Sequence, residues 1–466
     1  MTSTGEPQTY SLCDIFASGI NHDDELNALV EDAIYRLSNN PRLINQNPGG
    51  MAVIDLQGKA YVLSKPLEIK KLNLVTVANG TLIAGPQFPE NEYLIQCQRV
   101  HGVKFYNLLL ECSKRANGFF FDDFFRVRVE DCYVIHQKNY GIYSSPTGNN
   151  HELEIMKCHV CEYLFGDGYP KKTVNYGVIP EYDVDANRVS TGIYLGQADN
   201  VVADCNINLC RVGIFSGMRA NRIHGNHITG GGSKELEIYK GIELNNFHKS
   251  SAMIVNNYID NCCLWINCNA DDKKNLRNYF HVTDNLFYRG YNHPKAGGEF
   301  SHIIINPLEP DSLIANLHIC DNKFYNQPEN LEGIKPRVIK PIQILKSEGT
   351  NINHGKIQGV NASSNYFTNC YPTFVVPMGT RASKKVKVTP EKNNYNIDFS
   401  DIIPMGIIRE CSIDIEQIKG NKRCSTQAQI SFRSIQLEAH VDYPVLVVVS
   451  VCAECNNLQR YNYSVH

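Results

Sequence analysis

The sequence has no excess of charge of either sign and no apolar run long enough to span a bilayer. Its 466 residues carry 45 Lys and Arg against 48 Asp and Glu, a net charge of −3 at pH 7. Proteins that bind nucleic acid or anionic membranes through charge are usually far more basic, so we expect neither partner. The first 14 residues also lack the basic and apolar regions of a signal peptide, which predicts synthesis in the cytoplasm and no membrane insertion.

Zinc-ligand spacing is also lacking, although the chain contains 17 cysteines. Its two C-x-x-C pairs, Cys158/Cys161 and Cys452/Cys455, have no second pair or Cys/His partner motif at the spacing of a zinc site. The odd total and the missing signal peptide favour reduced thiols over disulfides. We therefore expect no metal and no cofactor.

Nine short segments share one pattern, which returns at intervals of 21 to 47 residues. Each segment begins with an apolar anchor residue and carries a second apolar residue five positions later. Three positions after the anchors stands a column that contains Leu108, Cys132, Cys158, Cys205, Asn226, Asn257, Asn285, Asn322 and Asn365. Like residues that return to like positions are typical of a solenoid. The pattern predicts an all-β, single-stranded, right-handed parallel β-helix.

A second column shows how each repeat is built. Strands open with Gly followed by an apolar residue at Gly118, Gly141, Gly192, Gly213 and Gly241. Each repeat therefore contains at least two short strands joined by a tight turn. An Asn at such a turn tolerates the left-handed backbone and bonds the Asn one rung away, about 4.8 Å distant. We expect the five Asn from Asn226 to Asn365 to form a structural stack.

Three regions are predicted along the chain. Residues 1–48 form an N-terminal cap whose helix is apolar at i, i+3, i+4 spacing from Leu26 to Leu37. Residues 49–392 form the β-helix, and residues 393–466 form a β-rich domain for trimerisation or carbohydrate binding. The basic segment 381–392 is interpreted as a solvated linker. The apolar run 443–449 is interpreted as a sandwich core or a subunit interface.

The start of the coil resembles a known superfamily. An acidic cap, a helix with Ala33 and Ile34, a Gly-Gly pair and the segment from Gly58 to Ile69 are similar to the opening of pectate-lyase-like right-handed parallel β-helix proteins. In particular they resemble the branch with bacteriophage tailspikes and capsule depolymerases. The resemblance covers about residues 23–386 and implies a homotrimer that a C-terminal β-rich module completes. The resemblance indicates the fold more than the function, because this scaffold hosts lyases, hydrolases, epimerases, fructotransferases and adhesins, and no catalytic motif of the family is found in the chain.

A row of aromatic side chains is predicted on the outside of the coil. In each glycine strand the residue after the inward apolar one points outward. The row contains Phe120, Tyr143, Tyr194, Phe215, Glu243 and Trp265, with His302 further along. Aromatic rings pack on the apolar faces of sugars, while acidic groups bond sugar hydroxyls. The row predicts a polysaccharide groove; the alternative is that loops or a neighbouring subunit bury the rings.

A glycosidase needs two carboxyl groups, about 5 Å apart for retention or about 6.5–9.5 Å apart for inversion. Glu243 is the best-placed single acid, although its column neighbours are aromatic. Its partner must come from a neighbouring column or loop, and the candidates are Glu237, Asp199 and Asp204, in that order.

A lyase that acts on a uronic-acid polymer instead needs a base and a group that neutralises the sugar carboxylate. Tyr288, Arg289, Tyr291 and His293 offer these residue types within one loop. Because a lone His is more often structural, this loop weighs less than Glu243.

The sequence thus predicts a phage tailspike-type depolymerase that binds and cleaves a capsule, exopolysaccharide or lipopolysaccharide, by hydrolysis rather than elimination. Such an enzyme would be a homotrimer in the tail of a virion, if the chain is viral. A non-catalytic receptor-binding or structural fibre, and a β-helix oligosaccharide enzyme such as a fructotransferase, stay open as alternatives.

Overall fold

The structure is a computed structural model of the chain. It describes residues 21–38, 52–162, 190–230, 240–246, 251–268, 279–288, 291–292, 300–308, 314–315, 317–325, 339–344, 357–358, 361–363, 365–368, 381–399, 407–415, 424–431, 434–441 and 445–454. The chain divides into two compact units, Met1–Trp265 and Ile266–His466. No helix among the described residues is long and apolar enough to cross a bilayer.

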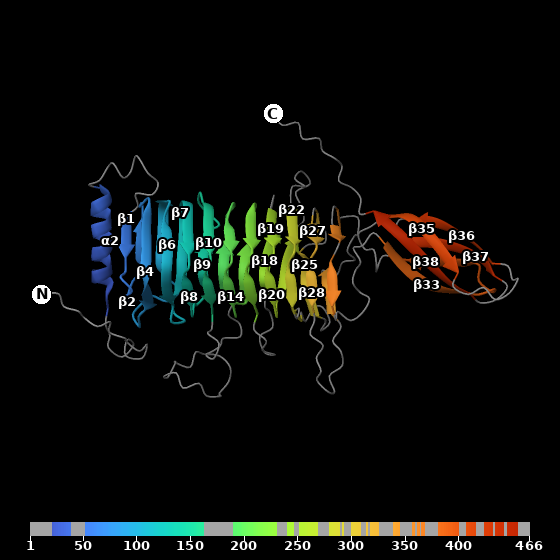
Figure 1. Cartoon of the computed structure of the whole chain (residues 1–466), viewed down its shortest axis with the longest axis horizontal. Helices are drawn as coiled ribbons and strands as arrows, with labels where there is room; N and C mark the ends of the chain where they lie inside the picture. The colour runs from blue at the N-terminus through green and yellow to red at the C-terminus, as the bar shows by residue number, and fades with distance from the viewer. Residues whose placement is uncertain are drawn as a thin grey trace, which may run out of the picture. The chain divides into compact units, whose positions relative to one another are not determined.

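The first unit begins with a capping helix, α2 (Asp23–Ser38), which confirms the predicted helix. Three acidic residues occupy its first turn, where the helix dipole stabilises carboxylates. Asp23 accepts hydrogen bonds from the backbone N–H and the hydroxyl of Ser64, and these bonds tie the helix to the coil. Leu26 is buried. Figure 1 shows the helix beside β1 (Ala52–Asp55), so that it covers the first rung.

After the helix the chain winds through three ladders of parallel strands, which we name faces A, B and C. Face A contains β1, the first halves of β4 (Val75–Ala84) and β6 (Lys104–Glu111), the second half of β7 (Asn117–Glu130), β10 (His151–Met156), β13 (Val201–Ala203), β16 (Asn221–His224) and β19 (Ser251–Val255). Face B contains β2 (Ala60–Leu63), the second halves of β4 and β6, β8 (Tyr133–Ile135), β11 (His159–Cys161), β14 (Asn206–Asn208), β17 (His227–Thr229) and β20 (Tyr258–Asp260).

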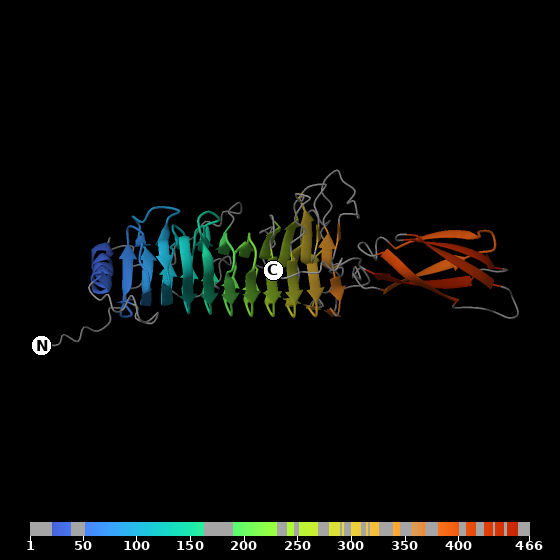
Figure 2. The same cartoon turned by 90° about the horizontal axis from the view of Figure 1, so that it is seen from above.

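Face C contains β3 (Leu67–Lys70), β5 (Tyr93–His101), the first half of β7, β9 (Tyr140–Ser144), β12 (Thr191–Leu195), β15 (Val212–Ser216), β18 (Lys240–Asn246) and the start of β21 (Cys263–Cys268). Each rung runs through the faces in the order C, A, B. Figures 1 and 2 show the strands of this unit stacked side by side, from blue to green. This arrangement is the predicted parallel β-helix.

The inside of the first unit is filled by the anchor residues of the repeat. Fully buried anchors are Phe105, Val129, Ile155, Val202, Ile223 and Ile254. Because side chains of a strand alternate between its two faces, the polar neighbours of these anchors point outward. A ligand would therefore bind along an outer face of the coil.

The second unit contains further rungs of the same kind. One ladder joins β22 (Tyr279–Thr283), β27 (Leu317–Cys320) and β31 (Asn361–Ser363); a second joins β23 (Leu286–Tyr288), β28 (Lys323–Tyr325) and β32 (Tyr366–Thr368); a third joins β25 (Phe300–Pro307) and β29 (Ile339–Ile344). Two short pairs accompany them, β24 (Tyr291–Asn292) with β25 and β26 (Ile314–Ala315) with β30 (Ile357–Gln358).

The predicted side-chain bonding of the asparagine stack is confirmed within each unit, but the left-handed backbone falls on the residue before the column, such as Asn256 and Asp284, and not on the asparagines of the column. In the first unit the Asn226 side-chain amide donates to the Oδ1 of Asn257 at 2.9 Å. In the second, Asn285 donates to the Oδ1 of Asn322 at 2.9 Å, and Asn322 donates to that of Asn365 at 3.1 Å. The stack lies at the corner between consecutive ladders, where it satisfies turn backbone that would otherwise be buried without partners.

A second asparagine ladder, which the sequence analysis missed, lies at the corner between faces C and A. Asn200 donates to the Oδ1 of Asn221 at 3.0 Å, and its own Oδ1 accepts a bond from the backbone N–H of Leu153. Both asparagines stand two residues before an anchor. That repeated position was the signal that could have revealed them.

The cysteines of the turn column are buried, as predicted. Cys132, Cys158 and Cys205 occupy consecutive rungs and are free thiols. They pack as small side chains in the same column as the asparagines.

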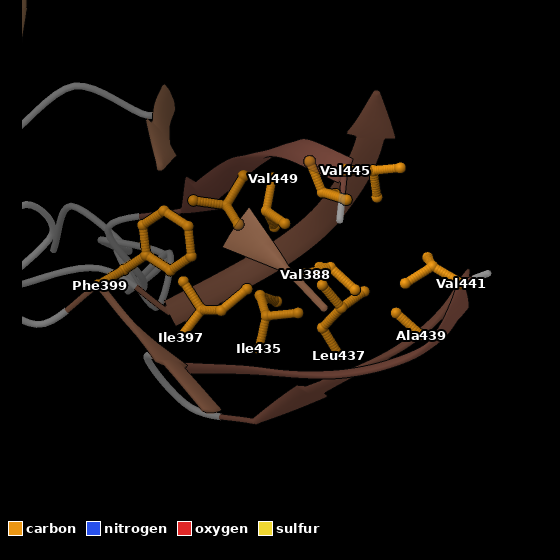
Figure 3. Close-up of a cluster of buried hydrophobic side chains, with 11 residues drawn as sticks. Val388, Ile397, Phe399, Ile435, Leu437, Ala439, Val441, Val445 and Val449 are labelled. Carbon is orange, nitrogen blue, oxygen red and sulfur yellow. The ribbon is translucent and has the colours of Figure 1, made fainter. Parts of the chain in front are cut away.

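The tail is a sandwich of two antiparallel three-stranded sheets. The sheet that we name the lysine sheet contains β33 (Arg381–Val388), β38 (Val445–Glu454) and β35 (Ile407–Ile415). The sheet that we name the amide sheet contains β34 (Asn394–Asp398), β37 (Ser434–Val441) and β36 (Cys424–Ser431). Figure 3 shows their apolar side chains interleaved in one core.

This sandwich corrects one interpretation of the tail and, for the apolar run, selects the sandwich core over the subunit interface. The basic segment is a strand rather than a linker, because Val386 and Val388 face the core while Lys385 and Lys387 point outward. The sandwich therefore begins near residue 381 rather than 393. The apolar β38 likewise places alternate valines, Val445 to Val451, in the core of its own chain, so its composition does not call for a partner subunit.

Candidate functional site

The predicted outward column on face C is in register. Phe120 lies opposite Tyr143, Tyr143 opposite Tyr194, Tyr194 opposite Phe215, and Phe215 opposite Glu243. All five side chains are partly exposed. The column therefore forms one continuous strip along five rungs of the first unit.

A ladder of glycines lies beside this strip and keeps the strands close together. A Cβ added to Gly118 would lie 2.2 Å from the carbonyl oxygen of Gly141, and one on Gly213 would lie 2.4 Å from that of Gly241. Gly141 and Gly192 meet the next glycine at 2.6 and 2.7 Å in the same way. No side chain fits at these distances, which explains why the glycine column recurs in the sequence.

The rings of the strip stack on one another. Tyr194 and Phe215 have centroids 4.4 Å apart and planes 6° apart, and Tyr143 and Tyr194 lie 4.7 Å apart at 20°. Phe120 and Tyr143 are stacked at 5.9 Å. Each ring therefore covers the face of its neighbour, and what the strip offers to solvent is ring edges and Tyr hydroxyls. A sugar would meet edges and hydroxyls here, rather than the open faces that the sequence analysis expected.

Two tyrosines that the sequence analysis missed widen the strip. Tyr140 packs edge-on against Tyr143 at 4.7 Å and against Tyr194 at 5.8 Å, and Tyr93 contacts Phe120 at 5.2 Å. Tyr140 directly precedes a glycine of the glycine ladder. The residues that precede these glycines form a further column, and that repeated position was the signal that could have revealed Tyr140.

The hydroxyls of the strip stay protonated at neutral pH. Burial, the neighbouring Tyr143 and Tyr140 hydroxyls and the Glu243 carboxylate raise the pKa of Tyr194 above its ordinary value. Burial and Tyr140 raise the pKa of Tyr143 in the same direction. A protonated phenol both donates and accepts a hydrogen bond, as a sugar hydroxyl does. These tyrosines therefore suit hydroxyl recognition rather than the role of a base.

At one end of the strip Glu243 forms an ion pair with Lys240. The Oε1 of Glu243 lies 2.8 Å from the Nζ of Lys240, and the two side chains are only 12% and 19% exposed. The same ammonium group lies 4.7 Å from the centroid of the Trp265 ring. The ammonium group of Lys240 thus occupies the Oε1 of Glu243, one of the two oxygens through which a general acid or base would act.

Trp265 does not offer the open ring that the sequence analysis expected. Its side chain is buried, with 5% exposure, and Lys240 lies over it. A cation over an indole ring is a favourable contact that occupies the face a sugar would need. Trp265 therefore contacts Lys240 and makes no free platform for a sugar.

His302, expected further along the outward row, is fully buried in the second unit. Its ring lies 6.1 Å from that of Phe287 and 5.5 Å from that of Phe324, two interior residues. It points inward, so the prediction of an outward side chain was wrong.

The candidate partners of Glu243 lie at turns. Asp199, at the corner between faces C and A, faces the Nδ1 of His151 at 3.5 Å. Asp204, at the corner between faces A and B, is exposed beside Gly225. Glu237 lies outside the described residues. Both aspartates belong to the rung that begins with β12, and β15 lies between β12 and β18, the strand of Glu243.

The predicted lyase loop belongs to the second unit and is described only in part. Tyr288 ends β23 and stacks on Tyr325 at 5.1 Å. Tyr291 lies in β24, with its backbone opposite Ser301, and Arg289 and His293 lie outside the described residues. In the part of the chain that the structure describes, no group of three or more His, Cys, Asp or Glu side chains is arranged to hold a metal ion.

Comparison with known proteins gives one relative by sequence. No protein-family model matches the chain. It is similar to a polygalacturonase of Arabidopsis thaliana, with 26% identity over 228 residues that cover 46% of this chain and 43% of the relative. The chain thus matches less than half the length of that relative.

Solved structures of similar arrangement are phage tailspikes. The tailspike of Pseudomonas phage phi297 has a TM-score of 0.36 and 12% identity, covering 82% of this chain and 67% of its own. A tailspike double mutant of E. coli bacteriophage HK620 has a TM-score of 0.46 and 10% identity, covering 94% and 90%. The HK620 tailspike in complex with a pentasaccharide has a TM-score of 0.43 and 11% identity, with the same coverage. The ladders of the chain itself establish the fold, a parallel β-helix.

Proposed function

We propose that the chain binds a host surface polysaccharide along the strip on face C and cleaves it. The observation that carries the proposal is the strip itself: stacked, half-exposed aromatic rings on consecutive rungs that end at the carboxylate of Glu243. A polymer with a repeating unit suits a surface with a repeating unit, because each rung offers similar groups to each sugar. Edges and hydroxyls that are already in place lose little freedom on binding.

Two further observations support cleavage of a polysaccharide. The sequence relative is named as a polygalacturonase, and the opening of the coil resembles the tailspike and depolymerase branch. We favour hydrolysis, with Glu243 as one of the two carboxyls and Glu237, Asp199 or Asp204 as the other. Because Lys240 occupies the Oε1 of Glu243, Glu243 reaches a sugar through that oxygen only if bound substrate separates the pair, and it then acts as general acid, general base or nucleophile.

Elimination is the alternative chemistry within the same proposal. It would rest on the loop with Tyr288, Arg289, Tyr291 and His293, which offers a base and a cation. The experiment that decides is incubation of the native chain with capsular polysaccharides, exopolysaccharides, lipopolysaccharides and polygalacturonate. New reducing ends support hydrolysis, and ultraviolet absorbance of unsaturated uronates supports a lyase. A chain that neither binds nor cuts any of these polymers contradicts the proposal.

The second candidate is a receptor-binding fibre that does not cut. The Glu243–Lys240 ion pair favours it, since a carboxylate held by lysine also serves as an anchor for sugar hydroxyls. Binding without product in the same incubation would select it. Activity confined to short oligosaccharides would instead indicate an enzyme such as a fructotransferase.

The resemblance also supports a homotrimer, in the tail of a virion if the chain is viral. Since β38 is buried within its own sandwich, the apolar tail no longer supports this assembly. Light scattering under native conditions tests it: a mass near 52.6 kDa, that of one chain, would exclude the trimer.

A further inference from the structure

The outer face of the amide sheet carries a regular array of hydrogen-bonding side chains, five of them amides, with the carboxylates of Glu438 and Asp398 on the same face. Because successive residues of a strand alternate sides, every second residue of β34, β37 and β36 points away from the core. The amides of this outer face are Asn394, Asn396, Gln427, Gln429 and Gln436, and all five are exposed. The face therefore presents donors and acceptors to solvent from all three strands.

The strand register arranges these amides in rows. Gln436 on the central strand lies opposite Asn396 on one side and opposite Gln429 on the other. In the next row Glu438 takes the central place between the two remaining amides. Neighbouring strands lie about 4.8 Å apart and residues i and i+2 about 6.8 Å apart, so six polar groups share a patch of roughly 10 by 7 Å.

The chemistry of this patch fits hydroxyl groups. An amide donates through its N–H and accepts through its C=O, and a sugar hydroxyl also does both. On this face the Nε2 of His440 lies 3.1 Å from the Oε1 of Glu438. The outward positions of the two rows contain no Lys, no Arg and no apolar residue. A polyanion would need cations, and the centre of a protein interface would need apolar or aromatic groups.

The opposite face of the sandwich differs. On the lysine sheet, Lys385 and Lys387 are exposed, and the half-buried Leu446 and Val448 lie opposite them on β38. The two outer faces of one small sandwich thus carry different chemistry on the same core. The lysine sheet provides a matched control for the amide sheet.

We propose that the outer face of the amide sheet is a second carbohydrate-binding surface, which takes a neutral, hydroxyl-rich polysaccharide. The inference rests on the proposed function for the class of ligand, but it uses no residue of face C. Two weak contacts with one polymer bind it more tightly than either does alone, because the second contact forms at high effective concentration.

The test is retention of the full-length chain in native gels that contain a neutral glucan, galactan or mannan, or polygalacturonate as an anionic polymer. Replacing one row, Asn396→Ala with Gln429→Ala and Gln436→Ala, is expected to weaken binding of a retained neutral polymer at least about fivefold, the effect of losing one to two hydrogen bonds. The control variant, Lys385→Ala with Lys387→Ala, is expected to change binding less than about twofold. Thermal melting and light scattering check that both variants fold as the native chain does.

The possible results separate this surface from face C. A row variant that binds every polymer as the native chain does overturns the inference, and the proposed function then stands if Tyr194→Ala loses binding. If the row variant binds more weakly while Tyr194→Ala binds as the native chain does, the result supports the amide face and contradicts face C. A changed oligomeric mass in the row variant would make the face a contact between copies, and retention by polygalacturonate alone would point to cations; either result overturns the inference. A native chain that none of these polymers retains overturns the inference, while the incubation with capsular polysaccharides, exopolysaccharides and lipopolysaccharides still decides the proposed function.

Discussion

The asparagine stack and the aromatic strip are both columns of one residue per rung, yet the structure gives them opposite properties. In the stack, buried amides such as Asn226 and Asn257 bond one another and the turn backbone. In the strip, rings such as Tyr143 and Tyr194 stack on one another but stay half-exposed, with hydroxyls that sugar groups could bond. Repetition alone therefore does not distinguish structure from function. Burial and unused hydrogen-bonding capacity do.

The largest effect is expected for Glu243, whose replacement tests whether the strip takes part in cleavage or is only structural. Glu243→Gln is expected to lower turnover of a cleaved polysaccharide at least about a hundredfold while leaving binding nearly unchanged, the usual contribution of a general acid or base. The measurement is product formation at saturating polymer. Glu154→Gln on face A, which breaks an ion pair with Arg128, is the control and should keep full turnover. Full activity in Glu243→Gln would leave the Tyr288 to His293 loop and elimination as the mechanism.

The second prediction tests the effect of burial on His302, a buried residue in the second unit. Burial lowers the pKa of His302 from 6.5 to about 4, so the unfolded chain binds a proton between these values that the folded chain excludes. The stabilisation is thus complete above about pH 6.5 and is lost as pH falls through about 4, a difference of about 3 kcal/mol. Denaturant unfolding at pH 7 and pH 4.5 should show less acid sensitivity in His302→Phe than in the native chain. If His440→Asn, on an exposed side chain, reduced it equally, the assignment to His302 would be wrong.

The third prediction concerns the stack itself. Asn285→Ala removes a donor to Asn322 and to the carbonyl of Thr283, and is expected to lower the free energy of unfolding by about 1–3 kcal/mol, as for other buried groups left without partners. Asn107→Gly removes an exposed bond to Asn79 at 3.1 Å while keeping a backbone of φ 51° that Gly accepts, and should cost less. If both variants lost the same free energy of unfolding in denaturant melts, burial would not determine how much an asparagine bond stabilises the coil.

The smallest expected effect concerns the hydroxyls of the strip. Tyr194→Phe keeps the ring stack with Phe215 and Tyr143 and removes one hydroxyl, so glycan affinity should fall by about 0.5–1.5 kcal/mol with no change in melting temperature. Tyr106→Phe, on an exposed tyrosine of face A, is the matched control for calorimetric titration. An unchanged affinity in Tyr194→Phe would show that sugars do not contact the ring edges.

Much of the fold follows from the sequence because a β-helix repeats its local rules. Period-two alternation predicts which anchors point inward. Identical residues at the same position of successive rungs predict the Asn stack and the glycine ladder. The cap helix follows in the same way from its own spacing. The register of Phe120, Tyr143, Tyr194, Phe215 and Glu243 was predictable for this reason. Each of these features depends on residues that recur at the same position from one rung to the next.

The tertiary structure alone decided how these side chains use their surfaces. Stacking closes the ring faces of the strip, Lys240 both pairs with Glu243 and covers Trp265, and His302 turns inward among phenylalanines. The basic strand β33 joins a sandwich because β38, more than fifty residues later in the chain, pairs with it. The sequence by itself determined the columns, since those follow from local alternation. Contacts between residues far apart in the chain determined which columns are closed and which face solvent, because burial depends on what packs against a side chain.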